Sequence, residues 1–267
     1  MMDNILTRTL KHLKKKRIFL YTGSISFASM FALVPMMAIF LLLLSHLGFS
    51  TSHIKQFKLS LIDHLFSGND DPSINSYISS FIDNLQTLSP LLIFFWIVSC
   101  ILLLYSIEDS INEIFNINRR RSLKISLLLH IALMLFLPLV LMASFLLNHY
   151  ITHILTLKVC ASFTAPICQL LYIIPFIIDV LMCLILYSVF PAQKPRLKPL
   201  VIASTITGIM LYVAKYAVST YFTYTSTYTT IYGTISSIPI IMTSLYVIWY
   251  IIFLGAALCY LLNQPKD

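Results

Sequence analysis

Six long apolar segments constrain the fold of this chain more than any other feature of its sequence. Each has about 20 residues or more, the length that an α-helix needs to cross the hydrocarbon core of a bilayer. The segments are continuously apolar and lack the two-residue alternation of an outer-membrane barrel. We therefore predict six transmembrane helices, at residues 25–47, 89–107, 125–147, 166–190, 200–222 and 236–262.

The composition excludes an ordinary soluble protein. Of the 267 residues, 58% are hydrophobic and only 10% are charged, which is too little charge to cover a soluble surface. The predicted helices leave little chain for anything else, so we expect residues 1–267 to form a single all-α membrane domain. The first apolar run follows "KHLKKKR", but it is too long for a signal peptide, and we expect it to be retained as a helix.

The positive charges predict the orientation of the chain. If the N-terminus is cytoplasmic, fourteen lysines and arginines lie on the cytoplasmic side and three on the outer side. This asymmetry predicts that both termini are cytoplasmic. It also accounts for the net charge of +8 as a topology signal beside anionic headgroups, without a nucleic-acid partner.

The first outer loop, residues 48–88, is predicted to contain amphipathic helices. In "SINSYISSFIDNLQTL" the apolar side chains recur at helical spacing and the polar side chains occupy the opposite face. A lid packed on the helix bundle and a gate over a cavity are both consistent with this pattern.

Prolines inside four of the predicted spans favour bent helices. Each removes a backbone hydrogen bond and crowds the preceding turn. A bundle of kinked helices around a cavity is therefore expected, with kinks at Pro35, Pro138, Pro175 and Pro239.

Two charged residues lie inside predicted spans. Asp179 is in the fourth span and Lys215 in the fifth, and the short loop "PAQKPRLKP" makes these helices antiparallel neighbours at similar depth. An unpaired charge there is expensive, so we predict that the two residues pair. A stabilising pair and part of a polar path for substrate or protons are both consistent with this prediction.

An acidic turn ends the second span. It contains Glu108, Asp109, Asn112 and Glu113, and it precedes "RRRSLK" at the predicted cytoplasmic edge. Pairing with those arginines is the simplest interpretation. A metal site is the weaker alternative, because carboxylates from one helical turn rarely complete a coordination shell.

Cysteines and histidines gather near the second outer loop. Cys160 and Cys168 would form a disulfide if that side is oxidising, and His149 and His153 are one turn apart, a weak metal-binding pattern. No stronger metal or redox motif occurs, so we expect no metal, no cofactor and no catalytic residue.

The segment "YFTYTSTYTTIYG" joins the fifth and sixth spans on the predicted outer side. If it is helical, its tyrosines form one stripe that suits either an aromatic belt or an uncharged cavity mouth for sugar or lipid headgroups. A glycine then supplies the turn before the sixth span. The tyrosines of this stripe are Tyr221, Tyr224, Tyr228 and Tyr232, and the glycine is Gly233.

Several of these motifs resemble the YihY/BrkB family of bacterial inner-membrane proteins, over nearly the whole chain. "SISFASMFALVPMMAIF" looks like the opening signature of that family, and "LLLYSIEDSINEIF" is similar to its second signature. In the final third, Lys215, Pro239, Trp249, "IYG" and "LGA" fall where the family motif has them. The chain departs from the family at Ala257, where glutamate is common, and Asp179 has no family counterpart that we can place.

The resemblance implies six transmembrane helices in the bacterial inner membrane and a link to the envelope and to lipopolysaccharide. With the bent helices and the polar pair, it favours a transporter or translocation factor for an amphipathic envelope lipid or a lipopolysaccharide precursor. A non-transporting envelope scaffold that binds other membrane proteins is the main alternative. The ribonuclease label formerly attached to the family is least favoured, so we expect no enzyme. The expected partners are membrane lipids, either anionic or lipopolysaccharide-related. A further copy of the same chain, in a homo-oligomer, is also consistent with the sequence.

Overall fold

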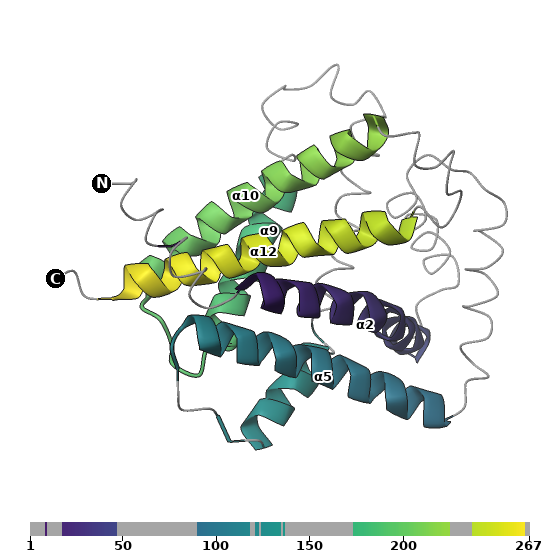
Figure 1. Ribbon diagram of the computed structural model, residues 1–267. Coiled ribbons are helices and arrows are strands. Elements are labelled where there is room, and N and C mark those ends of the chain that lie inside the picture. Colours follow the sequence, from purple (N-terminus) through teal and green to yellow (C-terminus); the bar gives the residue numbers. More distant parts are fainter. Residues whose placement is uncertain are drawn as a thin grey trace, which may run out of the picture. The chain divides into compact units, whose positions relative to one another are not determined.

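The computed structural model describes residues 9, 18–46, 90–117, 121–122, 124–134, 136, 173–224 and 237–264. Every regular element within these ranges is an α-helix, so the predicted all-α class is confirmed. A short apolar helix covers Lys124–Met134. Five longer helices are drawn in Figure 1: α2 (Ile18–His46), α5 (Pro90–Ile114), α9 (Ile173–Val189), α10 (Leu197–Tyr224) and α12 (Ser237–Asn263).

The helix boundaries extend furthest beyond the predicted spans at the start of α2 and the end of α5. α2 begins at Ile18, before the predicted residue 25, and α5 continues to Ile114, beyond the predicted residue 107. Hydropathy marks where a segment leaves the apolar region, whereas a helix continues as long as its backbone hydrogen bonds form. The acidic turn therefore belongs to α5 itself.

Three of the described helices contain a stretch that is long and apolar enough to cross a membrane. These stretches are Phe94–Ile114 in α5, Leu197–Val218 in α10 and Ile241–Asn263 in α12. Shorter apolar helical stretches cover Ile18–Ala32, Lys124–Met134 and Phe176–Val189. The count of six spans and the single-domain organisation stay predictions.

The chain divides into two compact units. The first consists of Met1–Met30, Leu103–Ser126 and Ile173–Asp267, so it holds the whole of α9, α10 and α12. The second consists of Phe31–Leu102 and Leu127–Tyr172. In the described part of the second unit, Pro35 and Cys100 are buried, and the exposed rings of Phe94 and Phe95 meet edge to face with centroids 6.1 Å apart.

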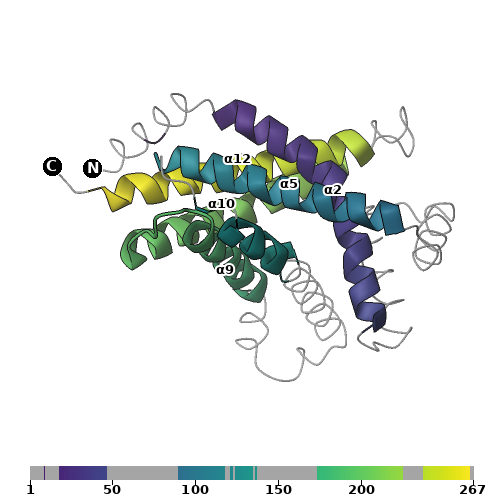
Figure 2. The same ribbon diagram turned by 90° about the horizontal axis from the view of Figure 1, so that it is seen from below.

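The core of the first unit combines large rings with small residues. Tyr187, Phe190 and Phe253 are fully buried, as are Ala203 and Ala256. Small residues let helix backbones approach closely, which is how membrane helices gain packing energy without a hydrophobic driving force. Figures 1 and 2 show α10 and α12 running beside each other, with α9 against α10.

The N-terminal half of α2 is joined to α12 in the same unit. The indole Nε1 of Trp249 donates a hydrogen bond of 2.9 Å to Ser29 Oγ. The rings of Phe19 and Tyr250 stack with centroids 5.3 Å apart. One polar and one aromatic contact thus hold residues that are far apart in the sequence.

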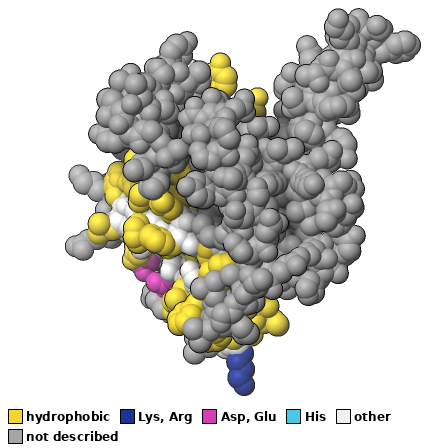
Figure 3. Space-filling model, turned by 90° about the vertical axis from the view of Figure 1, so that its right-hand side faces the viewer, with side chains coloured by type: hydrophobic (Ala, Val, Ile, Leu, Met, Phe, Trp, Pro, Cys, Tyr) yellow, Lys and Arg dark blue, Asp and Glu magenta, His cyan; other side chains and the backbone are white. Residues whose placement is uncertain are grey.

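The exposed surface of the described helices is mainly apolar. Large apolar side chains are exposed on α2, α5, α9 and α10, whereas from Ile241 to the end of α12 they are half-buried or buried. In Figure 3 the described part of one face is mostly hydrophobic, with few charged side chains. Such a surface suits contact with lipid chains.

Candidate functional site

The two charged residues predicted inside spans are in contact. Lys215 Nζ on α10 lies 2.6 Å from Asp179 Oδ1 and 2.8 Å from Asp179 Oδ2 on α9. The lysine side chain is 54% exposed, whereas the aspartate side chain is only 15% exposed. The pair therefore presents its cation to the surface and keeps its anion mostly covered.

Close packing of two antiparallel helices brings this pair together. Gly208 on α10 abuts Val180 on α9, and a Cβ added at Gly208 would lie 3.4 Å from the Val180 Cα atom. Further along the same contact, Tyr187 Oη on α9 lies 3.2 Å from Thr207 Oγ1 on α10. Residues nearer the N-terminus of α9 contact residues nearer the C-terminus of α10. The two helices are therefore antiparallel, as the short loop between them predicts.

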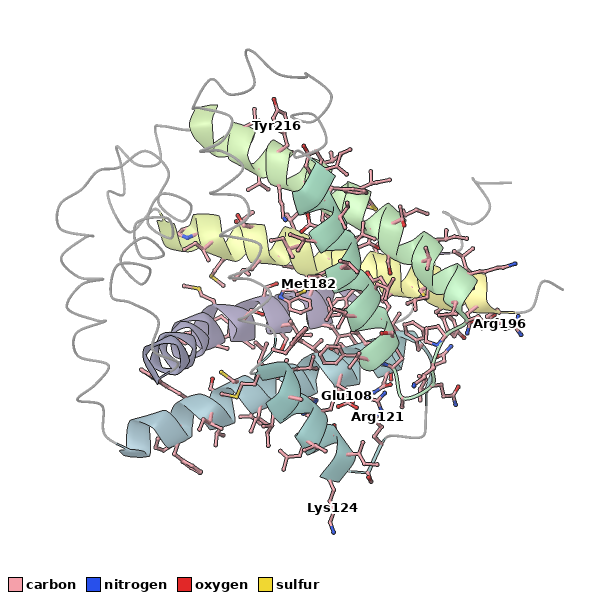
Figure 4. All side chains as sticks on the ribbon, turned by 180° about the vertical axis from the view of Figure 1, so that it is seen from behind. Glu108, Arg121, Lys124, Met182, Arg196 and Tyr216 are labelled. Carbon is pink, nitrogen blue, oxygen red and sulfur yellow. The ribbon has the colours of Figure 1, made fainter. Side chains whose placement is uncertain are left out.

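The surroundings of the pair are aromatic and apolar. Tyr212 lies three residues before Lys215 on α10, and its ring meets that of Phe176 on α9 edge to face, with centroids 6.4 Å apart. Tyr216 follows Lys215 directly and is 75% exposed. Figure 4 shows Tyr216 far along α10 from Arg196, which precedes that helix. Further exposed apolar side chains on the two helices are Ile177, Leu181, Ile209 and Val213.

A buried polar contact joins α9, α10 and α12. The Tyr187 hydroxyl donates a hydrogen bond of 2.7 Å to the carbonyl oxygen of Ile252, and Thr207 Oγ1 donates one of 2.8 Å to the carbonyl oxygen of Ala203. Gly255 faces both side chains, because a Cβ at that position would collide with Thr207 Oγ1 and Tyr187 Oη. This contact holds α9 and α10 in the register that the ion pair needs.

The acidic turn of α5 forms a hydrogen-bonded junction. Glu108 is buried and accepts a hydrogen bond from Ser126 Oγ. Asn112 Oδ1 accepts a hydrogen bond of 2.8 Å from the backbone N–H of Ala192, in the loop after α9. Arg121 donates a hydrogen bond of 2.8 Å to the carbonyl oxygen of Pro191 in the same loop. Figure 4 shows Glu108 and Arg121 in one region of the molecule.

The end of α5 is anchored to α12. Asn116 has φ of 55°, and the Ile117 N–H bonds the Asn112 carbonyl oxygen at 3.0 Å, which is a Schellman C-cap. The Asn116 side chain donates a hydrogen bond of 2.7 Å to Tyr260 Oη on α12. The residues predicted as an acidic turn thus take part in fixing a loop and a helix end.

Comparison with known proteins identifies the family. A family model described as Virulence factor BrkB matches residues 9–267. The chain belongs to the BrkB family. The resemblance predicted from the sequence motifs is thereby confirmed.

The relatives of this BrkB family protein are named as membrane proteins. A UPF0761 membrane protein of Mannheimia succiniciproducens is 25% identical over 91% of this chain and 84% of the relative. A UPF0761 membrane protein of Pseudoalteromonas atlantica is 24% identical over 97% of this chain and 86% of the relative. One from Kangiella koreensis is 27% identical over 94% of this chain and 61% of the relative. No solved structure matches the chain.

The prolines of this BrkB protein occupy two kinds of position. Pro35 lies inside α2, where the expected kink has its physical cause. Pro175 and Pro239 lie in the first described turn of α9 and α12, so the kinks predicted there stay predictions. Pro138 lies outside the described residues.

Other predicted sites lie partly or wholly outside the described residues. α10 continues through Tyr221 and Tyr224, so the first half of the tyrosine stripe is helical, while Tyr228, Tyr232 and Gly233 are not described. The candidate disulfide and histidine pair, together with the loop 48–88, are also not described: Cys160, Cys168, His149 and His153. Within the described ranges Cys100, Cys183 and Cys259 are free thiols, and no group of three metal-binding side chains forms.

Tyr212 and Tyr216 were missed as site residues in the sequence. Both lie in a continuous apolar span, where a tyrosine resembles any other large ring. The spacing of Tyr212 from Lys215 could have predicted that the two residues lie on the same helical face, because they are three residues apart. The tertiary structure adds that both tyrosines are exposed and that the Tyr212 ring meets that of Phe176 on α9.

Proposed function

We propose that this BrkB family protein translocates an amphipathic envelope lipid, or a lipopolysaccharide precursor, between the leaflets of the bacterial inner membrane. One observation carries the proposal: the side chain of Lys215 is 54% exposed within a helix of membrane-spanning length. Ionisable groups inside membranes are costly, usually face the bundle interior or a water-filled cavity, and often mark substrate pathways. A cation there offers a lipid headgroup a strongly polar partner beside the exposed apolar side chains of α9 and α10.

The surface around the cation favours an amphiphile over a small soluble substrate. The exposed side chains near the pair in sequence are Tyr212, Tyr216 and aliphatic residues of α9 and α10. A lipid would place its headgroup on the ammonium and its chains on those apolar side chains. A soluble ion would gain nothing from the apolar flank.

The proposal makes the protein a lipid-binding membrane component and not an enzyme. Glu108 is the natural candidate for a ribonuclease carboxylate, yet it is buried and accepts a hydrogen bond from Ser126. A carboxylate in that position is poorly placed to activate water on RNA. Metal-dependent RNA cleavage by the purified protein, abolished by Glu108→Gln, would support the ribonuclease alternative.

Reconstitution tests the proposed function. The protein is placed in liposomes that carry a trace of fluorescent phosphatidylglycerol or fluorescent lipid A, and dithionite reports how fast inner-leaflet lipid reaches the outside. We expect faster exchange than in protein-free liposomes, slowed about tenfold or more by Lys215→Met because the headgroup loses its cation.

A matched variant controls for loss of positive charge. Lys198→Met removes an exposed lysine from the first turn of the same helix, α10, and should leave exchange unchanged. Exchange no faster than in protein-free liposomes for both lipids would refute the proposal. Cross-linking for protein partners would then test the scaffold alternative.

A further inference from the structure

We infer that Lys215 binds the phosphate group of a lipid, and that Asp179 holds the ammonium until the lipid displaces it. This deepens the proposed function by naming the chemistry of the headgroup, and its meaning for transport rests on that proposal. Binding itself can be measured without transport.

The geometry leaves the ammonium able to take a second partner. An ammonium group carries three N–H donors, and Asp179 offers two oxygens, at 2.6 and 2.8 Å. The approach is open on the side of Lys215, whose side chain is 54% exposed against 15% for Asp179. An incoming ligand therefore meets the cation before the carboxylate, which selects an anion.

The neighbouring phenols fit a phosphate group. Tyr212 and Tyr216 lie three residues before and one residue after Lys215, and both are exposed. A phosphate has several acceptor oxygens, so it can take hydrogen bonds from the ammonium and from a phenol together. The ring bodies supply an apolar flank for the glycerol and the first part of the acyl chains.

The apolar flank distinguishes a lipid from a soluble phosphate. Ile177, Leu181 and Val213 are exposed on the same two helices within two residues of the pair in sequence. These side chains add affinity only for a ligand that brings its own apolar surface. A low-dielectric setting also strengthens a charge-assisted hydrogen bond to the bound phosphate.

Asp179 acts in this scheme as an internal competitor. Without lipid it keeps the intramembrane ammonium paired, which avoids the cost of an isolated charge. When phosphate binds, the carboxylate and the phosphate share one cation and repel each other. Neutralising Asp179 should therefore strengthen phosphate binding, an effect opposite to that expected if the pair served only to hold the helices.

Native mass spectrometry of the delipidated full-length protein in detergent tests the inference. The probes are phosphatidylglycerol, a diacylglycerol with the same chains and no phosphate, and glycerol 3-phosphate with no chains. We expect only phosphatidylglycerol to bind, about tenfold more weakly to Lys215→Met, about threefold or more tightly to Asp179→Asn, and unchanged to Lys198→Met.

A charge swap keeps the test valid if the single variants fail to fold. Asp179→Lys combined with Lys215→Asp retains an ion pair but puts the carboxylate on the exposed side, so phosphatidylglycerol binding should be lost. Tyr216→Phe should weaken binding about twofold to fivefold, because one phenol donor is removed from an exposed position.

Four results would overturn the inference. These are equal binding of phosphatidylglycerol to the parent and Lys215→Met, weaker binding to Asp179→Asn, equal binding of diacylglycerol, and binding of glycerol 3-phosphate. The last would indicate a soluble phosphate ligand. Binding as expected without lipid exchange in liposomes would refute the proposed function alone, and exchange unaffected by Lys215→Met would refute only the inference.

Discussion

Replacing Gly255 by alanine tests how closely α12 packs against α9 and α10. A Cβ at this position would overlap Thr207 Oγ1 and Tyr187 Oη and would lie 3.0 Å from Thr207 Cβ. Neither neighbour can retreat easily, because Thr207 is bonded to the Ala203 carbonyl oxygen and Tyr187 to the Ile252 carbonyl oxygen. The added methyl group must therefore strain the packing or break these bonds.

The expected loss follows from those contacts. Overpacking a close-packed interior by a methyl group costs about 1–3 kcal/mol, and each interhelical hydrogen bond in a membrane is worth about 0.6 kcal/mol. We expect Gly255→Ala to lower the free energy of unfolding by about 2–4 kcal/mol if the Tyr187 bond is also broken. Unfolding by sodium dodecyl sulfate in mixed micelles, followed by circular dichroism, measures this change.

Second-site substitutions at Thr207 identify the cause. Thr207→Ala removes the oxygen that the new methyl group meets, so the double variant should recover about 1 kcal/mol relative to the sum of the single effects. Thr207→Val is the matched control, because it keeps an atom in that place while removing the hydroxyl group. Wild-type stability of Gly255→Ala, or equal rescue by alanine and valine, would refute the reasoning.

Three further predictions concern the hydrogen-bonded junction at the end of α5 and the orientation of the chain. Asn112→Ala should lower stability in the same assay by about 1–3 kcal/mol, because the Ala192 N–H loses its acceptor; Asn112→Asp, which keeps an acceptor oxygen, should cost less. Asn116→Ala should destabilise more than Asn116→Gly by about 1 kcal/mol, since alanine is strained at φ of 55° whereas both lose the side-chain bond; equal losses would contradict the C-cap argument. Alkaline phosphatase fused after Asp267 should be inactive, because both termini are predicted to be cytoplasmic; an active fusion would reverse the topology.

Much of the fold could be predicted because a membrane helix requires a long apolar segment, which the hydropathy of the sequence reveals directly. The described helices fall where the apolar segments are, and the disagreement is confined to their ends, as at Ile18 and Ile114. The contact between Asp179 and Lys215 also followed from one-dimensional facts. A short loop makes two helices antiparallel, and equal distances from that loop put the two residues at similar depth.

The backbone contacts made by the acidic turn and by the arginine that follows it could not be predicted in the same way. The predicted pairing of its carboxylates with the neighbouring arginines stays a prediction. The structure adds that Asn112 accepts a hydrogen bond from the Ala192 N–H and that Arg121 donates one to the Pro191 carbonyl oxygen. Ala192 is 80 residues from Asn112 in sequence, and Pro191 is 70 residues from Arg121. Residue type does not show which distant side chain will bond a given backbone group.

The sequence by itself determined that this chain is a helical membrane protein, which family it resembles, and which two charges meet. Length, hydropathy and charge bias suffice for that because each is a property of position along a helix. Only the tertiary structure decided that Lys215 and not Asp179 is the exposed partner, and that Gly255, Thr207 and Tyr187 meet in one buried contact. Those facts depend on how each helix is rotated about its axis and how closely its neighbours approach, and side chains from distant segments set both.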